Sequence, residues 1–289
     1  MGTPPVPSSP SSPSSPSLPE PVTEAGRDGL AALLARPERA LVALDFDGTL
    51  APIVDDPARA YAHQDALPAL AGLAPRVGVL AIITGRPAEV AVRLGGFAGH
   101  PELAGLTVLG AYGAERWDAA TGRLHRPPPH PGIVVARAEL AALVERSGPG
   151  VLLEDKGNAL AVHTRTAPDP AGVFAALRAP LAELAARLGL ALEPGRFVLE
   201  VRPPGTDKGA ALTALARETD ASAVLYGGDD LGDLAAFDAV AKLREAGVPG
   251  LRVCSGSTEV AELAAVTDVT VDGPAGVAGL LSALAAALG

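Results

Sequence analysis

Two carboxylates separated by one residue mark the most informative point of the chain. Asp45 and Asp47 directly follow the apolar run 41–44, which has the composition of a buried strand. Side chains at positions i and i+2 of a strand point to one face, so both acids can approach one ligand. Gly48 allows a sharp turn, and Thr49 offers a hydroxyl. Because adjacent carboxylates repel each other unless a cation or proton separates them, the pattern predicts Mg²⁺ beside an attacking carboxylate. The alternative is a solvated acidic turn.

Two further groups are suited to holding a phosphoryl group. Thr84 and Gly85 follow the second apolar run, 77–83, and offer a hydroxyl and a flexible backbone; Arg86 comes next. The alternative for the Thr-Gly pair is a turn that caps the following helix. Lys208 opens a predicted helix, where its charge and the positive end of the helix can act on the same anion.

The loop after the run 223–226 supplies more acids. It reads Gly-Asp-Asp-Leu-Gly-Asp and contains Asp229, Asp230 and Asp233. Carboxylate oxygens are the ligands that Mg²⁺ prefers in proteins. An acidic surface turn is the alternative, but the cation expected beside Asp45 favours a metal site to which both loops contribute.

The elements that must position these groups alternate between strand and helix. Strands are expected at 41–44, 77–83 and 106–109, with helices at 29–40, 66–73 and 88–94 between them; the same alternation resumes after residue 205. This order is typical of an α/β fold with a parallel sheet. The carboxyl ends of such strands share one edge, where the acids, Thr84 and Lys208 would meet.

The middle of the chain has a different pattern. Strand-like runs at 151–155 and 159–165 are joined by a Lys-Gly-Asn turn typical of a hairpin, and helices are expected at 134–146 and 170–188. We therefore predict a core domain formed by residues 27–117 and 204–289, with an inserted α+β module at 118–203.

Composition excludes several classes of protein. The 289 residues carry a net charge of −10 without a basic block, so no nucleic-acid partner is expected. Residues 1–26 are rich in Pro and Ser and are predicted to be a disordered leader and not a signal peptide. No apolar run is long enough to span a membrane. The single cysteine, Cys254, excludes an intramolecular disulfide. The single cysteine is consistent with a reducing compartment, so we expect a cytoplasmic location. We also expect a monomer.

Taken in order, the four phosphate- and metal-directed segments resemble the haloacid dehalogenase-like phosphohydrolases from about residue 40 to the end. The resemblance implies a Rossmann-like core with an inserted cap. It implies that Asp45 is the nucleophile that forms an aspartyl-phosphate and that Asp47 is the general acid/base. Thr84 and Lys208 would hold the phosphoryl group. The implied Mg²⁺ ligands are Asp45, the backbone carbonyl of Asp47, and Asp229, Asp230 and Asp233, the last two in supplementary or outer positions.

Within that superfamily, two segments resemble the caps of trehalose-6-phosphate phosphatases. The segment 153–165 carries Glu154 and Lys156, and the segment 196–203 carries Glu200, at positions that grip sugar hydroxyls in that family. Gly110 to Glu115 resembles the family's glycine-rich turn. The resemblance implies a small-molecule sugar-phosphate substrate, with Gly85 and Arg86 as further binding residues. His163 is expected to fill the cap strand and not to touch substrate.

Two alternatives stay open. One is a phosphatase for another sugar phosphate, such as sucrose phosphate or mannosyl phosphoglycerate. The other is a non-catalytic regulator that binds sugar phosphate. The Glu154, Lys156 and Glu200 set argues against the first, and the retained Asp45 and Asp47 argue against the second.

Overall fold

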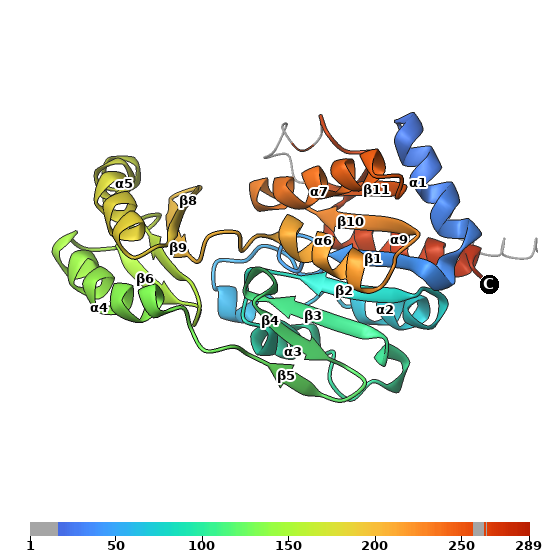
Figure 1. The fold of residues 1–289 in the computed structure, drawn as a ribbon, viewed down its shortest axis with the longest axis horizontal. Helices are drawn as coiled ribbons and strands as arrows, with labels where there is room; N and C mark the ends of the chain where they lie inside the picture. Colours follow the sequence, from blue (N-terminus) through green and yellow to red (C-terminus); the bar gives the residue numbers. More distant parts are fainter. Residues whose placement is uncertain (1–16, 257–262, 264) are drawn as a thin grey trace, which may run out of the picture.

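The computed structural model describes residues 17–256, 263 and 265–289 (Figure 1). Two β-sheets with their own helices form the molecule, a large one of eight strands and a small one of four. Residues 126–130 and 203–207 connect them (Figure 1). The predicted α/β fold with an inserted smaller module is confirmed.

The large sheet has the strand order β12-β11-β10-β1-β2-β3-β4-β5. Its strands are β1 (Ala40–Leu44), β2 (Val79–Ile83), β3 (Leu106–Gly110), β4 (Glu115–Asp118), β5 (Arg123–His125), β10 (Ala223–Gly228), β11 (Gly250–Gly256) and β12 (Val269–Asp272). Its helices are α1 (Glu24–Ala35), α2 (Ala66–Leu73), α3 (Ala88–Gly95), α6 (Lys208–Glu218), α7 (Leu234–Glu245) and α9 (Gly273–Ala287).

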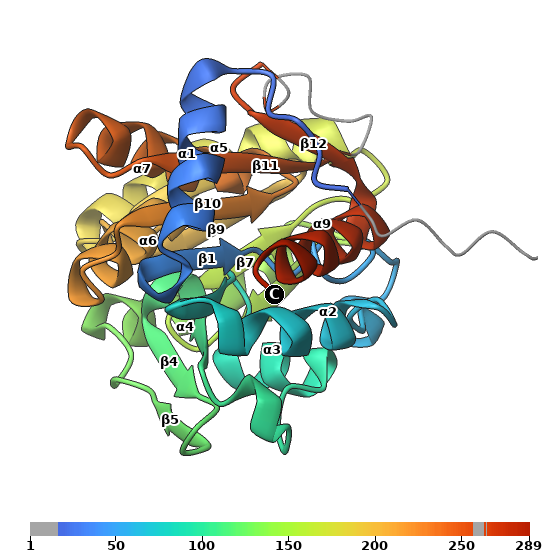
Figure 2. The ribbon, with the colours of Figure 1, turned by 90° about the vertical axis from the view of Figure 1, so that its right-hand side faces the viewer.

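Helices cover both faces of the large sheet (Figure 2). Every residue of β1 is buried, as an apolar run without polar alternation predicts for a central parallel strand. Successive side chains of a strand point to opposite faces. Val42 and Leu44 therefore pack in one core with α1, α2, α3 and α9, whereas Leu41 and Ala43 pack in the other with α6 and α7.

The strand order brings the predicted motifs together. β1 pairs in parallel with β10 on one side and with β2 on the other, so the loops after residues 44, 83 and 228 leave the same edge of the sheet. Chain connections run to opposite sides at this point, which is where open α/β sheets bind their ligands.

The small sheet has a core of its own. Its order is β6-β7-β9-β8, all antiparallel, with the bounds β6 (Leu152–Asp155), β7 (Leu160–His163), β8 (Ala191–Gly195) and β9 (Val198–Arg202). Helices α4 (Pro131–Arg146) and α5 (Pro170–Arg187) pack against one face of it. The predicted hairpin between β6 and β7 is confirmed, while β8 was not predicted from the sequence.

Two predicted boundaries are wrong. Residues 118–125 were assigned to the inserted module, but β5 pairs with β4, and β4 extends the large sheet from β3 in antiparallel fashion. These two strands are short and mixed in polarity, so their sequence carried no strand signal. Helix α1 begins at Glu24, inside the segment assigned to the leader, because Thr23 caps it by accepting a hydrogen bond from the Gly26 N–H. Residues 1–16 lie outside the described residues.

Asp268 anchors this N-terminal helix to the sheet. Its fully buried carboxylate accepts hydrogen bonds from the Thr23 hydroxyl at 2.5 Å, from the Arg252 N–H at 2.7 Å and from the Arg244 guanidinium. The Asp268 carbonyl also accepts from the Val22 N–H. Burial alone would raise the pKa of Asp268, but these donors hold it below its usual value.

We predict that Asp268→Ala lowers the free energy of unfolding by about 3 kcal/mol, because it removes the buried carboxylate that accepts from the Arg252 N–H and pairs with the partly buried guanidinium of Arg244. Asp220→Asn, at a side chain that is 93% exposed and paired with the 45% exposed Arg39, should change it by less than about 1 kcal/mol. Denaturant unfolding followed by circular dichroism measures both. Because the pKa of Asp268 is lowered, the contribution should be present at neutral pH and lost in acid. Equal stability of the two variants would contradict the anchoring role.

Candidate active site

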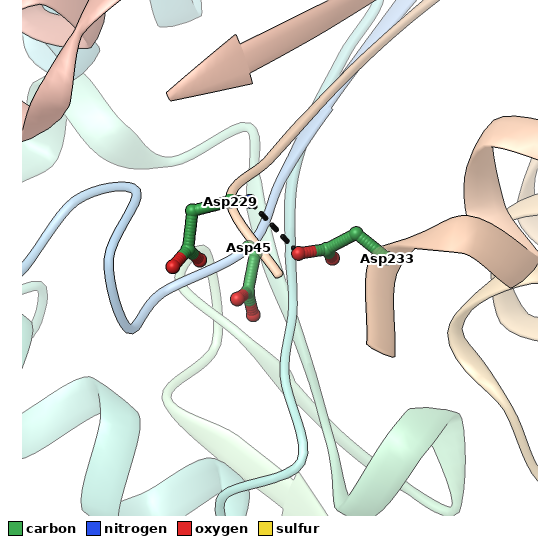
Figure 3. Close-up of side chains that lie close together, drawn as sticks. All are labelled: Asp45, Asp229 and Asp233. Carbon is green, nitrogen blue, oxygen red and sulfur yellow. Dashed lines mark hydrogen bonds between the residues drawn. The ribbon is translucent and has the colours of Figure 1, made fainter. Parts of the chain in front are cut away.

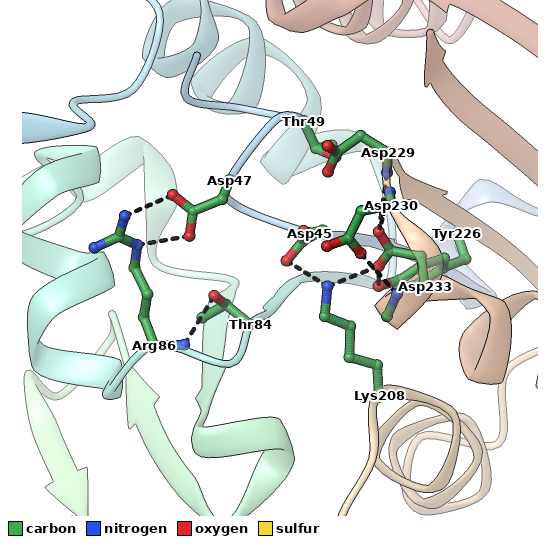
Figure 4. Close-up of polar contacts among 11 residues, drawn as sticks. Asp45, Asp47, Thr49, Thr84, Arg86, Lys208, Tyr226, Asp229, Asp230 and Asp233 are labelled. Carbon is green, nitrogen blue, oxygen red and sulfur yellow. Dashed lines mark hydrogen bonds and ion pairs between the residues drawn. The ribbon is translucent and has the colours of Figure 1, made fainter. Parts of the chain in front are cut away.

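Lys208 is the centre of the site. It is 5% exposed and opens α6, where its ammonium lies 2.9 Å from Asp45 Oδ1 and 2.8 Å from Asp233 Oδ1 (Figure 4). Asp45 directly follows β1, and its backbone N–H donates to the Gly227 carbonyl of β10. The lysine therefore links the ends of two neighbouring strands to the start of a helix.

Asp233 is already fully hydrogen-bonded. Its Oδ1 accepts from Lys208 and, at 2.6 Å, from the Tyr226 hydroxyl, and its Oδ2 accepts from the backbone N–H groups of Asp229 and Asp230 at 2.9 and 3.2 Å. A carboxylate offers about four acceptor positions. Asp233 is thus suited to orient Lys208 and the acidic loop, because its four acceptor positions are occupied by these donors.

The charges of this group depend on one another. Burial alone would lower the pKa of Lys208, but Asp233 and Asp45 outweigh it and hold that pKa well above its usual value. Burial raises the pKa of Asp45, and the nearby carboxylates add to the effect while Lys208 opposes it. The site therefore contains one permanent cation and a surplus of carboxylates that a second cation would relieve.

Asp229 is placed to share that second cation with Asp45 (Figure 3). Oxygens of Asp45, Asp229 and Asp233 lie within 4.8 Å of one another. Burial, followed by repulsion from Asp230 and Asp233, raises the pKa of Asp229 to about 8.

Gly48 makes this approach possible. It adopts a φ of +71°, and a Cβ there would lie 1.9 Å from Asp229 Oδ2. The convergent carboxylates of Asp45 and Asp229 carry more negative charge than Lys208 alone offsets, so they fit a hard, oxygen-seeking ion such as Mg²⁺. Asp230 instead caps the turn 231–233 by accepting from the Gly232 N–H.

Asp47 faces away from Lys208 and toward Arg86. The guanidinium of Arg86 donates two hydrogen bonds of 2.6 Å to the two oxygens of Asp47 and lies 5.9 Å from the centre of the Phe46 ring. Thr84, which directly follows β2 and is 1% exposed, accepts from the Arg86 N–H. Strands β1 and β2 thus place a carboxylate, a hydroxyl and a guanidinium around one space in front of Asp45 (Figure 4).

The residues expected to bind sugar also lie together. Lys156 Nζ donates to Glu200 Oε2 at 2.6 Å and lies 3.9 Å from Glu154 Oε2. Glu200 is 5% exposed, and its Oε1 accepts no hydrogen bond from the described residues. His163 was expected only to fill the strand, but its Nε2 lies 2.8 Å from Glu154 Oε2 and extends the polar group.

Four residues of the site were not singled out from the sequence. Tyr226 holds Asp233, and Ser255 donates to the Gly48 carbonyl at 2.7 Å. Tyr112 and Arg202 stack on each other between the two sheets. Tyr226 lies in an apolar run and Ser255 directly follows one, so the sequence predicts only buried strands there. Tyr112 lies in the glycine-rich segment 110–115, and an aromatic residue in such a turn could have drawn attention to it.

Comparison with known proteins agrees with this geometry. A family model for trehalose-phosphatases matches residues 43–269, which include every motif described above except the N-terminal helix. The chain belongs to the trehalose-phosphatase family. Members of this family are phosphatases, so the chain is assigned to the hydrolases.

Individual relatives extend the match. A probable trehalose-phosphate phosphatase of Sinorhizobium fredii is 35% identical over 222 residues, covering 75% of this chain and 80% of the relative. The trehalose-phosphate phosphatase of Mycobacterium tuberculosis H37Rv is 36% identical over 270 residues; the match covers 89% of this chain but 63% of that longer protein. A structure of Aspergillus fumigatus trehalose-6-phosphate phosphatase superposes with a TM-score of 0.65 at 26% identity, covering 93% of this chain and 99% of that one.

Among the described helices of this trehalose-phosphatase family member, none is long and apolar enough to cross a membrane.

We predict that Mg²⁺ raises the melting temperature of this trehalose-phosphatase homologue, because the ion relieves the repulsion between Asp45 and Asp229. At a concentration one hundred times the dissociation constant the gain is about 2.7 kcal/mol. Asp229→Asn should abolish the Mg²⁺-dependent shift, whereas Asp55→Asn, at an exposed carboxylate, should keep it. Differential scanning fluorimetry with and without EDTA measures this. A shift that survives Asp229→Asn would argue against the site.

Proposed function

We propose that this protein is a Mg²⁺-dependent phosphatase that hydrolyses trehalose 6-phosphate to trehalose and phosphate through an aspartyl-phosphate on Asp45. The observation that carries the proposal is the buried Lys208, which holds Asp45 at 2.9 Å at the edge of the sheet. The relatives described above are named trehalose-phosphate phosphatases, which supports the choice of trehalose 6-phosphate. We also propose a cytoplasmic location, with which the free, buried Cys254 agrees. For the oligomeric state we propose a monomer.

The attacking group is the Asp45 carboxylate. One of its oxygens faces Lys208, which leaves the other to form a bond with the phosphorus atom as the bond from phosphorus to the sugar oxygen breaks. Lys208 and Thr84 would neutralise and hold the phosphoryl oxygens, since phosphoryl transfer depends mainly on positioning and charge neutralisation. Mg²⁺, held by Asp45, Asp229 and the Asp47 carbonyl, would supply further positive charge at these oxygens.

Asp47 moves the protons in both halves of the reaction. In its protonated form it gives a proton to the departing sugar oxygen; as a carboxylate it then takes a proton from the water that attacks the phosphorus of the aspartyl-phosphate. That second step restores Asp45 and releases inorganic phosphate. The two hydrogen bonds from Arg86 fix the orientation of Asp47.

Selection of the sugar falls to the small sheet, for which we propose the role of a cap formed by residues 131–202. Glu154 lies near the end of β6, Lys156 lies in the turn after it, and Glu200 lies on β9, the neighbour of β7. A disaccharide offers many hydroxyl groups and little apolar surface, so charged donors and acceptors suit it. Glu200 Oε1 lies 3.5 Å from the Arg202 guanidinium but accepts no hydrogen bond from the described residues, so it is a buried acceptor that a sugar hydroxyl would satisfy.

A direct assay tests the proposal. We expect the purified protein to release phosphate from trehalose 6-phosphate in the presence of Mg²⁺, more efficiently than from sucrose 6-phosphate, and to lose the activity in EDTA. Asp45→Asn should lower turnover on the order of a thousand-fold or more without unfolding the protein, because the side chain lies at a loop edge. A preference for sucrose 6-phosphate would favour a different sugar-phosphate phosphatase. Binding without release of phosphate would favour the regulator.

The cap assignment makes a separate prediction. Lys156→Ala and Glu154→Ala should raise KM for trehalose 6-phosphate about tenfold or more, because each removes a charged hydrogen-bonding group from the sugar site. Hydrolysis of para-nitrophenyl phosphate, which is too small to reach the cap, should stay within about twofold. Steady-state kinetics with both substrates gives the comparison. Equal losses on the two esters would remove the cap assignment. Arg165→Ala, at an exposed residue beyond the end of β7, is a control.

A further inference from the structure

Tyr112 joins the phosphate side of the site to the sugar side. It lies in the turn 111–113 between β3 and β4, in the large sheet, yet its ring lies under the guanidinium of Arg202 from β9, 4.4 Å from the ring centre. Burial, followed by the charge of the adjacent Glu200, raises the pKa of the Tyr112 hydroxyl to about 12. The side chain therefore contacts both a cation and an anion of the small sheet.

The backbone of this turn is bound to the phosphate side. The Ala111 N–H donates to the Arg86 carbonyl at 2.7 Å, and the Tyr112 N–H donates to the Thr84 carbonyl at 2.9 Å. The ring also covers Gly85, since a Cβ at Gly85 would lie 2.8 Å from both Cζ and the hydroxyl oxygen of Tyr112. Movement of Tyr112 would thus move the turn that is expected to hold the phosphoryl group.

The turn itself is strained. Ala111 and Tyr112 have φ values of +47° and +57°, in the left-handed region that residues with a Cβ seldom occupy, and Gly113 follows at +96°. Such a conformation costs about 1–3 kcal/mol per residue and persists where surrounding contacts impose it, often at functional sites. Here the two backbone hydrogen bonds and the Arg202 stacking are those contacts.

We propose that Tyr112 is a positioning residue that sets the separation between the phosphate-binding turn Thr84–Arg86 and the sugar-binding carboxylate of Glu200. A substrate that carries both a phosphate and the correct sugar hydroxyl fills both ends at this separation. An ester that lacks the sugar uses only the phosphate end. The inference rests on the proposed function, because it takes trehalose 6-phosphate as the ligand that spans the two ends.

The test uses Tyr112→Phe, which keeps the ring on Gly85 and under Arg202 and removes only the hydroxyl beside Glu200. We expect KM for trehalose 6-phosphate to rise about fivefold to tenfold while kcat stays within about twofold, as loss of one hydrogen-bonding contact predicts. Hydrolysis of para-nitrophenyl phosphate should stay within about twofold. Tyr61→Phe is the matched control, because Tyr61 is 57% exposed and outside the site.

A double-mutant cycle assigns the effect to Glu200. In a Glu200→Ala background the Tyr112→Phe change should have no further effect on KM, since the partner of the hydroxyl is already absent. Independent effects in the cycle, an unchanged KM, or equal losses on both esters would each overturn the proposal.

A measurement without substrate separates this inference from the proposed function. Spin labels at Glu183→Cys in α5 and Ala214→Cys in α6 report the distance between the two sheets by double electron–electron resonance. We expect Tyr112→Ala to broaden or shift the distance distribution at unchanged melting temperature. If the wild type hydrolysed no trehalose 6-phosphate, the proposed function would fail, and an unchanged distribution would by itself overturn the role of Tyr112.

Discussion

The structure depends on a buried lysine held between two carboxylates. Removing an ammonium group from water is unfavourable, and its position is tolerable only because Asp45 and Asp233 both lie within 3 Å. Each of the three residues comes from a different part of the chain: the end of β1, the start of α6 and the turn after β10. The parallel pairing of β1 with β10 is what brings the two acids to the same lysine.

This arrangement separates the functions of residues that look alike in the sequence. Asp233 is fully hydrogen-bonded by Lys208, Tyr226 and two backbone N–H groups, so it positions other groups. The Asp229 carboxylate lies beside Asp45 and accepts a long hydrogen bond of 3.4 Å from the Thr49 hydroxyl. The Asp233 side chain points toward the start of α6, whereas the Asp229 side chain points across Gly48. The acidic loop therefore orients the lysine through Asp233 and, in the proposed function, supplies a metal ligand through Asp229.

In the proposed function, the large sheet binds the phosphate and the small sheet binds the sugar. Residues around Asp45 are suited to an anion and its metal ion, whereas Glu154, Lys156 and Glu200 offer charged donors and acceptors that suit hydroxyl groups. The two sets lie in separate cores, so their relative placement depends on the few contacts that cross between the sheets. Tyr112 makes such contacts, with Arg202 on its ring and Glu200 beside its hydroxyl.

The sequence by itself determined the elements whose local signal is strong. The uninterrupted apolar run of β1, the Asp-Phe-Asp-Gly-Thr segment after it and the Lys-Gly-Asn turn of the small sheet each combine residue type and spacing that fit one structure. From these the α/β fold, the inserted module and the group of Asp45, Thr84, Lys208 and Asp229 could be predicted. The short strands β4, β5 and β8 could not, because their mixed polarity is stabilised by neighbouring strands and not by local pattern. Only the tertiary structure decided the pairing of Arg86 with Asp47, the saturation of Asp233 and the place of Tyr112. These contacts join residues that are distant in sequence, and their energies depend on burial and mutual orientation, which no local pattern of residues specifies.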